Sequence, residues 1–300
     1  MFTSPILVTG ASGHLGRLVL ELLLSDGQQK ARPIIATTRT PDSLKDFAAK
    51  GVDVRRADFE DEAGLIEAFR GAKRALFIST DALDRPGRRL TQQKTAVRAL
   101  EAAGVEHVVY TSMPDAARSS VRVAPDHAGT EAALAASRLD YTILANNIYA
   151  DMLFVWLPPA LASGKLVDAR GEGKMAWVTR EDCARVAASV LREGAPGRRT
   201  LDVTGPAALS SKELAAIASD VFARPIEHVS IPLEALIQGM VDHGMPRPVA
   251  ELYASFDTAT ARNELARVSD AVERLTGRAP QSVREYLVAN RAALASPTRS

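Results

Sequence analysis

The sequence predicts an α/β protein in which a doubly wound parallel sheet is followed by a smaller, mainly helical C-terminal domain. Glycines recur at three-residue spacing between an apolar run and a Leu-rich amphipathic segment, at Gly10, Gly13 and Gly16. Short apolar runs then alternate with helical periodicity through the first half of the chain. From Ser210 onward the patterns are mainly helical. Such alternation is typical of a Rossmann-type sheet, with parallel strands, right-handed crossovers and helices on both faces.

The residues from Val8 to Gly16 predict a strand, a glycine turn and the start of a helix. Gly10 can adopt the positive φ of a tight turn, Gly13 lets the backbone approach a pyrophosphate, and Gly16 lets the helix lie close to its strand. Backbone N–H groups at a helix start favour an anion. The alternatives are a plain turn without a ligand and, for His14, a solvent-facing loop residue. We expect a dinucleotide here, bound by Gly10, Ser12, Gly13, His14, Leu15 and Gly16.

Composition indicates a soluble globular protein. The 300 residues, 46% hydrophobic and 24% charged, can bury a substantial core. Because 37 basic residues balance 36 acidic ones, the net charge of +1 disfavours binding to nucleic acid or an anionic membrane. The single cysteine, Cys183, excludes an internal disulfide, and five separated histidines disfavour a metal cluster. With neither a secretion signal nor a run of about 18 apolar residues, we expect a cytoplasmic protein without a membrane span.

Local patterns predict each element of the first half in turn. Apolar runs predict strands at 5–7, 33–38, 52–54, 75–78, 108–110 and 141–144. Apolar residues at helical spacing predict helices at 15–24, 42–50, 63–69, 90–103 and 126–137. In the second of these helices, Asp42 or Ser43 lies near the N-cap and Gly51 just past the end. Its Leu44 and Phe47 are expected to face inward.

After Tyr149 the alternation loosens. The apolar, proline-broken segment 153–159 predicts either the wall of a pocket or the end of a core helix. Strands are expected at 176–178 and 201–203 with a helix at 182–191, and segments within 175–205 are expected to rejoin the main sheet. Further helices are expected from Ser211 and Ile231, a strand at 227–230 and a frayed tail at 296–300. We therefore predict a nucleotide-binding domain at 1–150 and a smaller substrate-pocket domain at 151–300.

The end of the second strand indicates which dinucleotide is bound. A carboxylate there would bind the adenosine ribose of NAD, whereas this chain has Arg39 between Thr38 and Thr40. A guanidinium flanked by hydroxyls suits a phosphate, so NADP(H) is favoured.

Polar residues also follow the third and fourth strands. Asp58 is expected to accept a hydrogen bond from the adenine amino group with Phe59 against the ring; the alternative makes Asp58 the N-cap of the next helix. Ser79 and Thr80 follow the fourth strand, where they can line the ribose and nicotinamide.

The usual catalytic pair of short-chain reductases is missing. In Tyr-x-x-x-Lys the lysine lowers the tyrosine pKa so that the tyrosine can pass a proton to a carbonyl. None of the five tyrosines has a lysine four residues later. An ordinary alcohol dehydrogenase or sugar epimerase is therefore disfavoured.

Several motifs occur together along the chain. They are the glycine motif, Tyr110-Thr111-Ser112, His127-x-x-x-Glu131, Tyr141-Thr142-Ile143-Leu144 with Asn146 and Tyr149, and Gly171-x-Gly173-Lys174. Together they resemble the NmrA-like atypical short-chain reductases, and within them the NADPH:quinone oxidoreductase and triphenylmethane reductase branch. The resemblance is clearest to about residue 205.

The resemblance implies a nucleotide domain, a small C-terminal domain and a pocket between them. It assigns the 2′-phosphate of NADPH to Arg39 and places Asn146 and Tyr149 near the nicotinamide. Ala145 departs from the arginine that usually precedes this asparagine. His127 stands where other NmrA-like reductases have lysine, and this branch commonly has histidine there.

Three residues are candidates for the chemistry. His127 could orient the cofactor ribose or donate a proton, since the ordinary pKa of histidine lies near neutrality; the alternative is a surface pair with Glu131. Ser112 stands where the short-chain superfamily keeps a serine. The alternative is that its hydroxyl only forms hydrogen bonds with backbone groups at the end of the strand. Tyr149 is either an acid or a pocket wall with Met152, Phe154 and Trp156.

Two functions follow from this sequence. The leading hypothesis is an NADPH-dependent reductase that transfers hydride to quinones or similar conjugated electrophiles. For such acceptors the protein mainly has to position the cofactor and the acceptor for hydride transfer. The rival is a catalytically silent NADP-binding redox-sensing regulator of the NmrA type. The expected partner is a small electron acceptor, and the sequence leaves a homodimer open.

Overall fold

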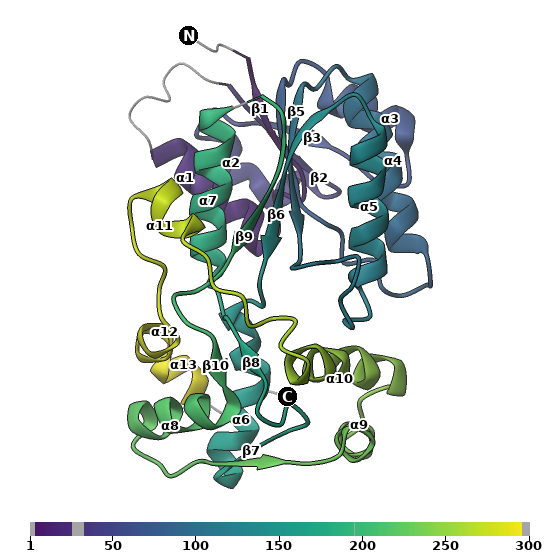
Figure 1. Ribbon diagram of the computed structural model, residues 1–300. Helices are drawn as coiled ribbons and strands as arrows, with labels where there is room; N and C mark the ends of the chain where they lie inside the picture. The colour runs from purple at the N-terminus through teal and green to yellow at the C-terminus, as the bar shows by residue number, and fades with distance from the viewer. Residues whose placement is uncertain (1–3, 26–32, 195, 296–300) are drawn as a thin grey trace. The chain divides into compact units, whose positions relative to one another are not determined.

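A computed structural model describes residues 4–25, 33–194 and 196–295, and its main feature is a seven-stranded sheet (Figure 1). The strands are β1 (Ile6–Val8), β2 (Ile34–Thr38), β3 (Asp53–Arg56), β4 (Arg74–Phe77), β5 (His107–Ser112), β6 (Asp140–Asn146) and β9 (Arg198–Val203). Their order is β3-β2-β1-β4-β5-β6-β9, and every pair from β3 to β6 is parallel. This is the predicted doubly wound sheet, since the strand order reverses between β1 and β4. The tail predicted at 296–300 lies outside the described residues.

The prediction that 201–203 rejoins the main sheet is confirmed by β9. The Tyr141 amide donates to the Gly197 carbonyl at 3.2 Å, and the Asn147 amide donates to the Val203 carbonyl at 2.9 Å. The residue numbers of the donors in β6 and of the acceptors in β9 increase in the same direction, so β9 runs parallel to β6.

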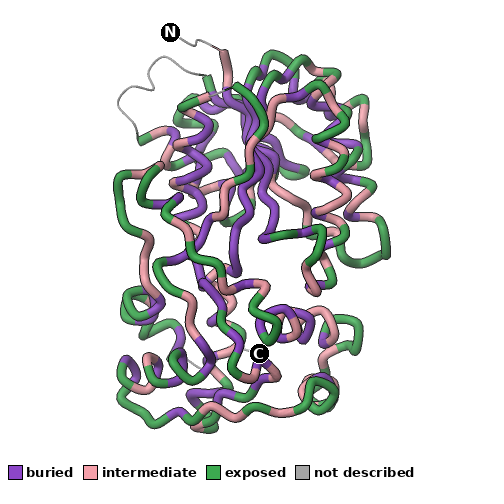
Figure 2. Tube along the Cα trace, viewed as in Figure 1, coloured by how far each residue is buried: buried purple, intermediate pink, exposed green. Residues whose placement is uncertain are grey.

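Helices cover both faces of the sheet, as predicted. In Figure 1, α1 (His14–Ser25) and α7 (Arg180–Glu193) lie on one face, and α3 (Glu62–Phe69), α4 (Arg88–Ala102) and α5 (Ala124–Ala136) lie on the other. Figure 2 shows the strands between them as a buried band. Within the described residues, no helix has both the length and the apolar composition needed to cross a membrane.

The second helix begins differently from the prediction. Pro41–Leu44 form a 3₁₀ turn, η2, and Lys45–Ala48 form α2, so Thr40 rather than Asp42 or Ser43 occupies the N-cap. The physical reason is Pro41, whose fixed φ and missing N–H suit the first position of a helical turn. The two residues predicted to face inward are buried.

The chain forms two compact units. The first is drawn from Met1–Ala116, Pro125–Ala145 and Cys183–Leu201, and the second from Ala117–Ala124, Asn146–Asp182 and Asp202–Ser300.

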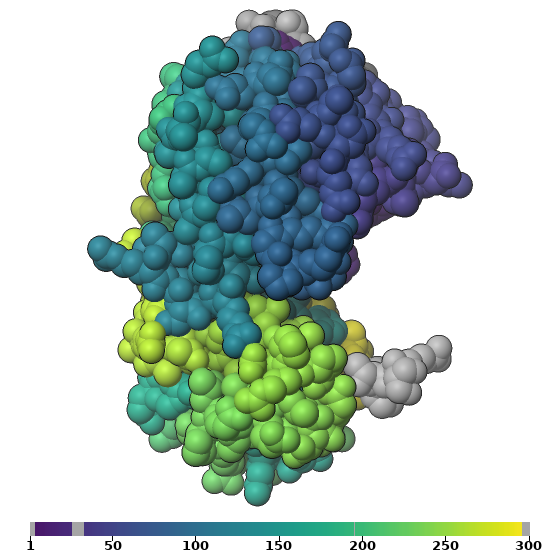
Figure 3. Space-filling view, turned by 90° about the vertical axis from the view of Figure 1, so that its right-hand side faces the viewer, coloured from purple at the N-terminus to yellow at the C-terminus, as the bar shows by residue number. Residues whose placement is uncertain are grey.

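The second unit is mainly helical and carries two small sheets. Its helices are η3 (Ala150–Met152), α6 (Leu153–Ser163), α8 (Ser211–Phe222), α9 (Leu233–Asp242), α10 (Arg247–Ala261), α11 (Ala271–Thr276), α12 (Val283–Ala289) and α13 (Arg291–Ala295). In one sheet β7 (Lys165–Asp168) pairs in parallel with β11 (Glu227–Ser230), the strand predicted at 227–230. In the other β8 (Lys174–Met175) pairs antiparallel with β10 (Leu209–Ser210). Figure 3 shows α9 and α10 as one continuous lime-coloured surface.

Two predictions for the second half were wrong. Residues 176–178 do not form a strand of the main sheet, because β8 ends at Met175 and the Ala176 amide donates instead to the Leu265 carbonyl at 2.9 Å. The segment 153–159 is not the end of a helix, because it forms the first part of α6 with Pro158 and Pro159 inside the helix. Proline has no N–H, so the carbonyl of Val155, four residues before Pro159, has no donor within the helix. Val155 is 45% exposed, so water can reach this turn of the helix.

Candidate cofactor and active site

The carboxyl ends of the strands bring most of the predicted site residues to one edge of the first unit. Reading across the sheet, β3 is followed by Asp58, β2 by Arg39, β1 by the glycine loop, β4 by Ser79 and Thr80, and β5 ends at Ser112. Neighbouring parallel strands lie about 4.8 Å apart, so these groups form a row along the edge. Ligands of open α/β sheets bind at such an edge where the strand order reverses.

The glycine loop has the geometry expected of a dinucleotide site. Gly10 adopts a φ of 58°, and the Gly13 amide donates to the Gly10 carbonyl at 3.0 Å. A Cβ at Gly16 would lie 2.5 Å from the Gly10 oxygen and 2.7 Å from the Cα of Ala11. The close approach predicted for Gly16 therefore exists, but its partner is the loop itself rather than the strand.

The remaining loop residues differ in what they can offer a ligand. The Ser12 hydroxyl hydrogen-bonds the Thr38 hydroxyl at 2.9 Å, and Thr38 accepts from the Thr40 amide at 3.2 Å, which ties the loop to the end of β2. His14 is exposed at the start of α1. Leu15 is only 6% exposed, so it packs in the core and can contribute only through its backbone.

Arg39 and Asp58 lie at one end of this row. Arg39 is exposed, and no ion pair or hydrogen bond of its side chain occurs within the described residues. Asp58 is half-buried, and its carboxylate accepts from the Glu60 amide at 3.1 Å. The alternative that Asp58 caps the next helix is wrong, because Asp61 is the N-cap of α3 and accepts from the Gly64 amide at 3.0 Å.

The groups after β3 and β4 are more enclosed. The Phe59 ring meets the buried Phe77 ring edge to face, with centroids 5.8 Å apart. The Ser79 amide donates to the Thr111 hydroxyl at 2.9 Å. The Thr80 hydroxyl oxygen is buried and has no hydrogen-bond partner in the described structure. A buried hydroxyl without a partner is costly, so this atom fits a ligand that supplies one.

Ser112 and Glu131 form a pair at the end of β5. The Ser112 hydroxyl donates to a carboxylate oxygen of Glu131 across a short contact. Both alternatives that the sequence left open for these residues are therefore wrong: Ser112 does not satisfy backbone groups, and Glu131 does not pair with His127. Burial raises the pKa of the Glu131 carboxyl, and the negative charge of Asp115 adds to this.

His127 is buried in a polar network rather than on a surface. One Arg89 nitrogen donates to Nε2 of His127 at 2.9 Å, so Nδ1 carries the ring proton and donates to the Tyr110 oxygen at 3.0 Å. The Tyr110 hydroxyl donates to Gln93 at 2.6 Å. Burial lowers the pKa of His127 to about 3, and the positive charge of Arg89 acts in the same direction. The ordinary histidine pKa, which made His127 a candidate proton donor, therefore does not apply here, and the ring is neutral under ordinary conditions.

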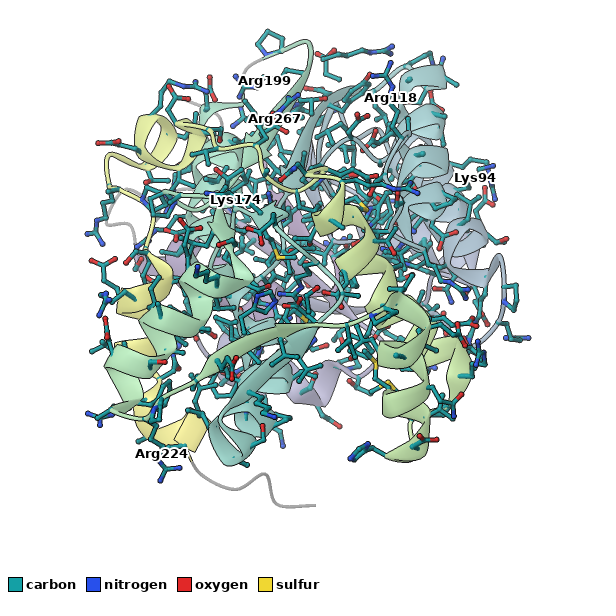
Figure 4. All side chains as sticks on the ribbon, turned by 60° about the horizontal axis from the view of Figure 1, so that its bottom comes forward. Lys94, Arg118, Lys174, Arg199, Arg224 and Arg267 are labelled. Atoms are coloured by element: carbon teal, nitrogen blue, oxygen red, sulfur yellow. The ribbon has the colours of Figure 1, made fainter. Side chains whose placement is uncertain are left out.

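Arg89 is the residue that sequence analysis missed. It is 5% exposed and also donates from Nε to the Thr80 carbonyl at 2.6 Å, which links the His127 network to the sheet edge. On the same helix Lys94 extends outward into solvent (Figure 4). The signal that could have found Arg89 is polar residues at helical spacing on the inward face of α4, where Arg89, Gln92, Gln93 and Thr95 are all buried.

The second unit carries its own polar cluster, which begins at the last residue of β6. The Asn146 amide nitrogen donates to the Tyr149 hydroxyl at 3.1 Å, whereas the Asn146 oxygen is buried and unpaired within the described residues. The Arg180 guanidinium lies 4.8 Å over the Tyr149 ring and forms an ion pair with Asp151 at 2.5 Å. These residues can position a flat ligand and offer it an acceptor.

The aromatic residues predicted to form one wall with Tyr149 have different partners. Phe154 meets Tyr286 edge to face, with centroids 6.5 Å apart. Trp156 meets Trp177 at 5.3 Å, with the Arg170 guanidinium 4.2 Å over its ring. Residues two apart on α6 point to different sides of the helix, so Phe154 and Trp156 do not form a single wall.

The family profile of NmrA-like proteins matches residues 3–287. The chain belongs to this family. The predicted resemblance is confirmed by this match and by quinone oxidoreductase 2 of Escherichia coli, to which this NmrA-like chain is 32% identical over 272 residues, covering 91% of the chain and 93% of that protein.

Solved structures of NmrA-like relatives agree over nearly the whole chain. The NADPH-dependent quinone oxidoreductase from Escherichia coli, complexed with NADPH, has a TM-score of 0.89 at 31% identity, covering 96% of this chain and 99% of that chain. The Citrobacter sp. triphenylmethane reductase, complexed with NADP(H), has a TM-score of 0.87 at 32% identity, covering 95% and 99%. The NAD(P)H azoreductase of Xenophilus azovorans is 28% identical over 289 residues, covering 96% of this chain and 98% of that protein.

Proposed function

We propose that this NmrA-like chain is an NAD(P)H-dependent oxidoreductase, and specifically an NADPH-dependent reductase that transfers hydride to quinones or similar conjugated electrophiles. The observation that carries the proposal is the exposed Arg39 at the end of β2, beside a glycine loop open to a pyrophosphate. The relatives named above are quinone, azo-dye and triphenylmethane reductases, and two of them were crystallised with NADPH or NADP(H).

The described residues fit NADPH along the whole edge of the first unit. The glycine loop offers N–H groups to the pyrophosphate, and Arg39 offers a guanidinium to the 2′-phosphate. Asp58 accepts from the adenine amino group beside Phe59, and Ser79 and the unpaired Thr80 hydroxyl bind the ribose. When bound, NADPH supplies the hydride.

The protein's part in the reaction is mainly positioning. A quinone needs a hydride and a proton, and it does not need the tyrosine and lysine that polarise an ordinary ketone. His127 is neutral and both of its ring nitrogens are hydrogen-bonded, so it acts by orienting Arg89 and Tyr110. Arg89 in turn holds the Thr80 carbonyl in place. Asn146 and Tyr149 are proposed to contact the nicotinamide end.

We assign different tasks to the two parts of the chain. Residues 1–150, together with the segment that contains β9, bind the cofactor. Residues 151–300 bind the electron acceptor, for which the aromatic and apolar side chains after Tyr149 are suited. The cytoplasmic location and the homodimer stay predictions of the sequence.

The test is NADPH oxidation by purified protein with a panel of quinones, azo dyes and triphenylmethane dyes. We expect turnover with at least one of these acceptors and faster turnover with NADPH than with NADH. Tight NADPH binding without turnover of any acceptor would contradict the reductase and favour the redox-sensing regulator. His127→Ala is expected to lower turnover through the position of Arg89, with the same optimum pH.

A further inference from the structure

The Ser112 and Glu131 pair places a carboxyl group directly behind a hydroxyl at the end of β5, where the pair can store and release a proton. Ser112 is the last residue of β5 and 6% exposed, and its hydroxyl bonds directly to Glu131 on α5. Neither His127, with both nitrogens occupied, nor the buried Tyr110 hydroxyl, which donates to Gln93, is free to do so.

Burial raises the pKa of the Glu131 carboxyl above that of an ordinary glutamate, although the hydrogen bond from Ser112 acts in the opposite direction. The carboxyl is half-buried, and the charged group that acts on it from β5 and the loop after it is Asp115. From β5 the Tyr110 hydroxyl also feels the charge of Glu131, and burial keeps this hydroxyl un-ionised by raising its pKa. No arginine or lysine within the described residues forms an ion pair with Glu131, in contrast to Glu101, which pairs with Arg138 at 3.1 Å.

The hydrogen bond can reverse when Glu131 is protonated. The ionised carboxylate accepts from Ser112, whereas the protonated carboxyl can donate to the Ser112 oxygen. The serine hydroxyl is then free to turn its own proton toward the sheet edge. A positioned carboxyl group is a recognised general acid, and here its proton would have to pass through the serine hydroxyl.

We propose that Ser112 and Glu131 form a proton relay to the reduced electron acceptor, with Ser112 touching the acceptor and Glu131 acting only through Ser112. This inference rests on the proposed function. Hydride transfer from NADPH turns a quinone into a hydroquinone monoanion and leaves NADP⁺. Ser112 gives its proton to the anionic oxygen and takes the proton of Glu131, and the Glu131 carboxylate then regains a proton from water.

The first test does not depend on turnover. Carbon-13 NMR of glutamate-labelled, cofactor-free protein follows the Glu131 carboxyl with pH, and Glu131→Gln identifies its signal. We expect a pKa above that of an ordinary glutamate. In Ser112→Ala it should rise further, because the hydroxyl that stabilises the carboxylate is gone. A Glu131 signal that titrates like an exposed glutamate in both proteins would overturn the relay.

The second test is the pH profile of acceptor reduction under NADPH saturation. A relay works while Glu131 is protonated, so the wild-type rate should fall as pH rises through the pKa of Glu131. In Glu131→Gln the low-pH rate should be about 100-fold lower and independent of this pKa. Ser112→Ala should behave likewise, whereas Ser112→Thr, which keeps the hydroxyl, should retain the wild-type profile.

Glu101→Gln is the matched control, because it removes a partly exposed, arginine-paired carboxylate of the same unit. Its profile should equal that of the wild type. If Glu131→Gln reduces acceptors at the wild-type rate with the wild-type profile, the relay is wrong and the proposed reductase stands. If the wild-type protein binds NADPH but reduces no acceptor, the proposed function fails and the relay fails with it.

Discussion

The two ends of the cofactor edge are built in opposite ways. At the adenosine end, which we define by Arg39 and Asp58, the side chains are exposed or half-buried and have few partners. At the hydride end, defined by Thr80 and Ser112, the groups are held by the buried Arg89 of α4 and the half-buried Glu131 of α5. The contrast indicates that the adenosine end selects a ligand by charge, whereas the hydride end is pre-organised for chemistry.

The largest effect is expected where the two ends meet, at the glycine loop. A Cβ at Gly16 would meet backbone atoms of Gly10 and Ala11 that cannot move aside cheaply. Gly16→Ala should lower the free energy of unfolding by about 3 kcal/mol and abolish NADPH binding measured by calorimetry. Its control is Gly239→Ala in α9, where nothing lies within 4 Å of the added Cβ. This control should be about 0.5 to 1 kcal/mol more stable than wild type; equal effects of the two changes would show that the loop is not tightly packed.

The network behind the hydride end should make stability depend on pH. Burial lowers the pKa of His127 from 6.5 to about 3, so the unfolded chain binds a proton that the folded chain excludes. The contribution to stability is full above pH 6.5 and is lost as pH falls toward 3, by about 1.4 kcal/mol per pH unit. Denaturant unfolding of wild type and His127→Gln between these limits measures the difference.

The exposed His243 provides the comparison for that prediction. His243→Gln should leave the acid dependence unchanged. If His127→Gln and wild type lose stability in parallel between pH 6.5 and pH 4, the hydride end is less tightly buried than the structure indicates.

A smaller effect is expected from Asp58 at the adenosine end. Asp58→Asn keeps an oxygen for the Glu60 amide but weakens the acceptor offered to the adenine amino group. NADPH and NADH should both bind about fivefold more weakly, since one hydrogen bond contributes about 1 kcal/mol and the two cofactors share the adenine. Unchanged affinities for both cofactors would show that Asp58 only stabilises the turn through the Glu60 amide and does not contact the adenine.

The sequence predicted the parts of the molecule that depend on local patterns. The glycine turn, the alternation of strands and helices, and the arginine after β2 can each be recognised from residues that are close together in the sequence. The helix caps were predicted less well, because Asp58 and Asp61 are both suitable cap residues and only the path of the chain chooses Asp61.

The hydride end could not be predicted in the same way, because its contacts join distant positions. Arg89 meets His127 across 38 residues, and Ser112 meets Glu131 across 19. Periodicity gives the spacing of His127 and Glu131 on one helix, and this spacing made a pair between them one of the two alternatives. Instead each pairs with another element: His127 is buried and Glu131 half-buried, and buried polar groups require hydrogen-bond partners.

The most direct test of the central claim is the cofactor preference of Arg39→Ala. Calorimetric titration with NADPH and NADH should give wild-type protein a preference for NADPH of about 30-fold, the equivalent of about 2 kcal/mol for a charge-assisted contact to the 2′-phosphate. In Arg39→Ala the affinity for NADH should be unchanged and the affinity for NADPH should fall to the same level. An Arg39→Ala protein that still prefers NADPH, or a wild-type protein that binds the two alike, would contradict the account.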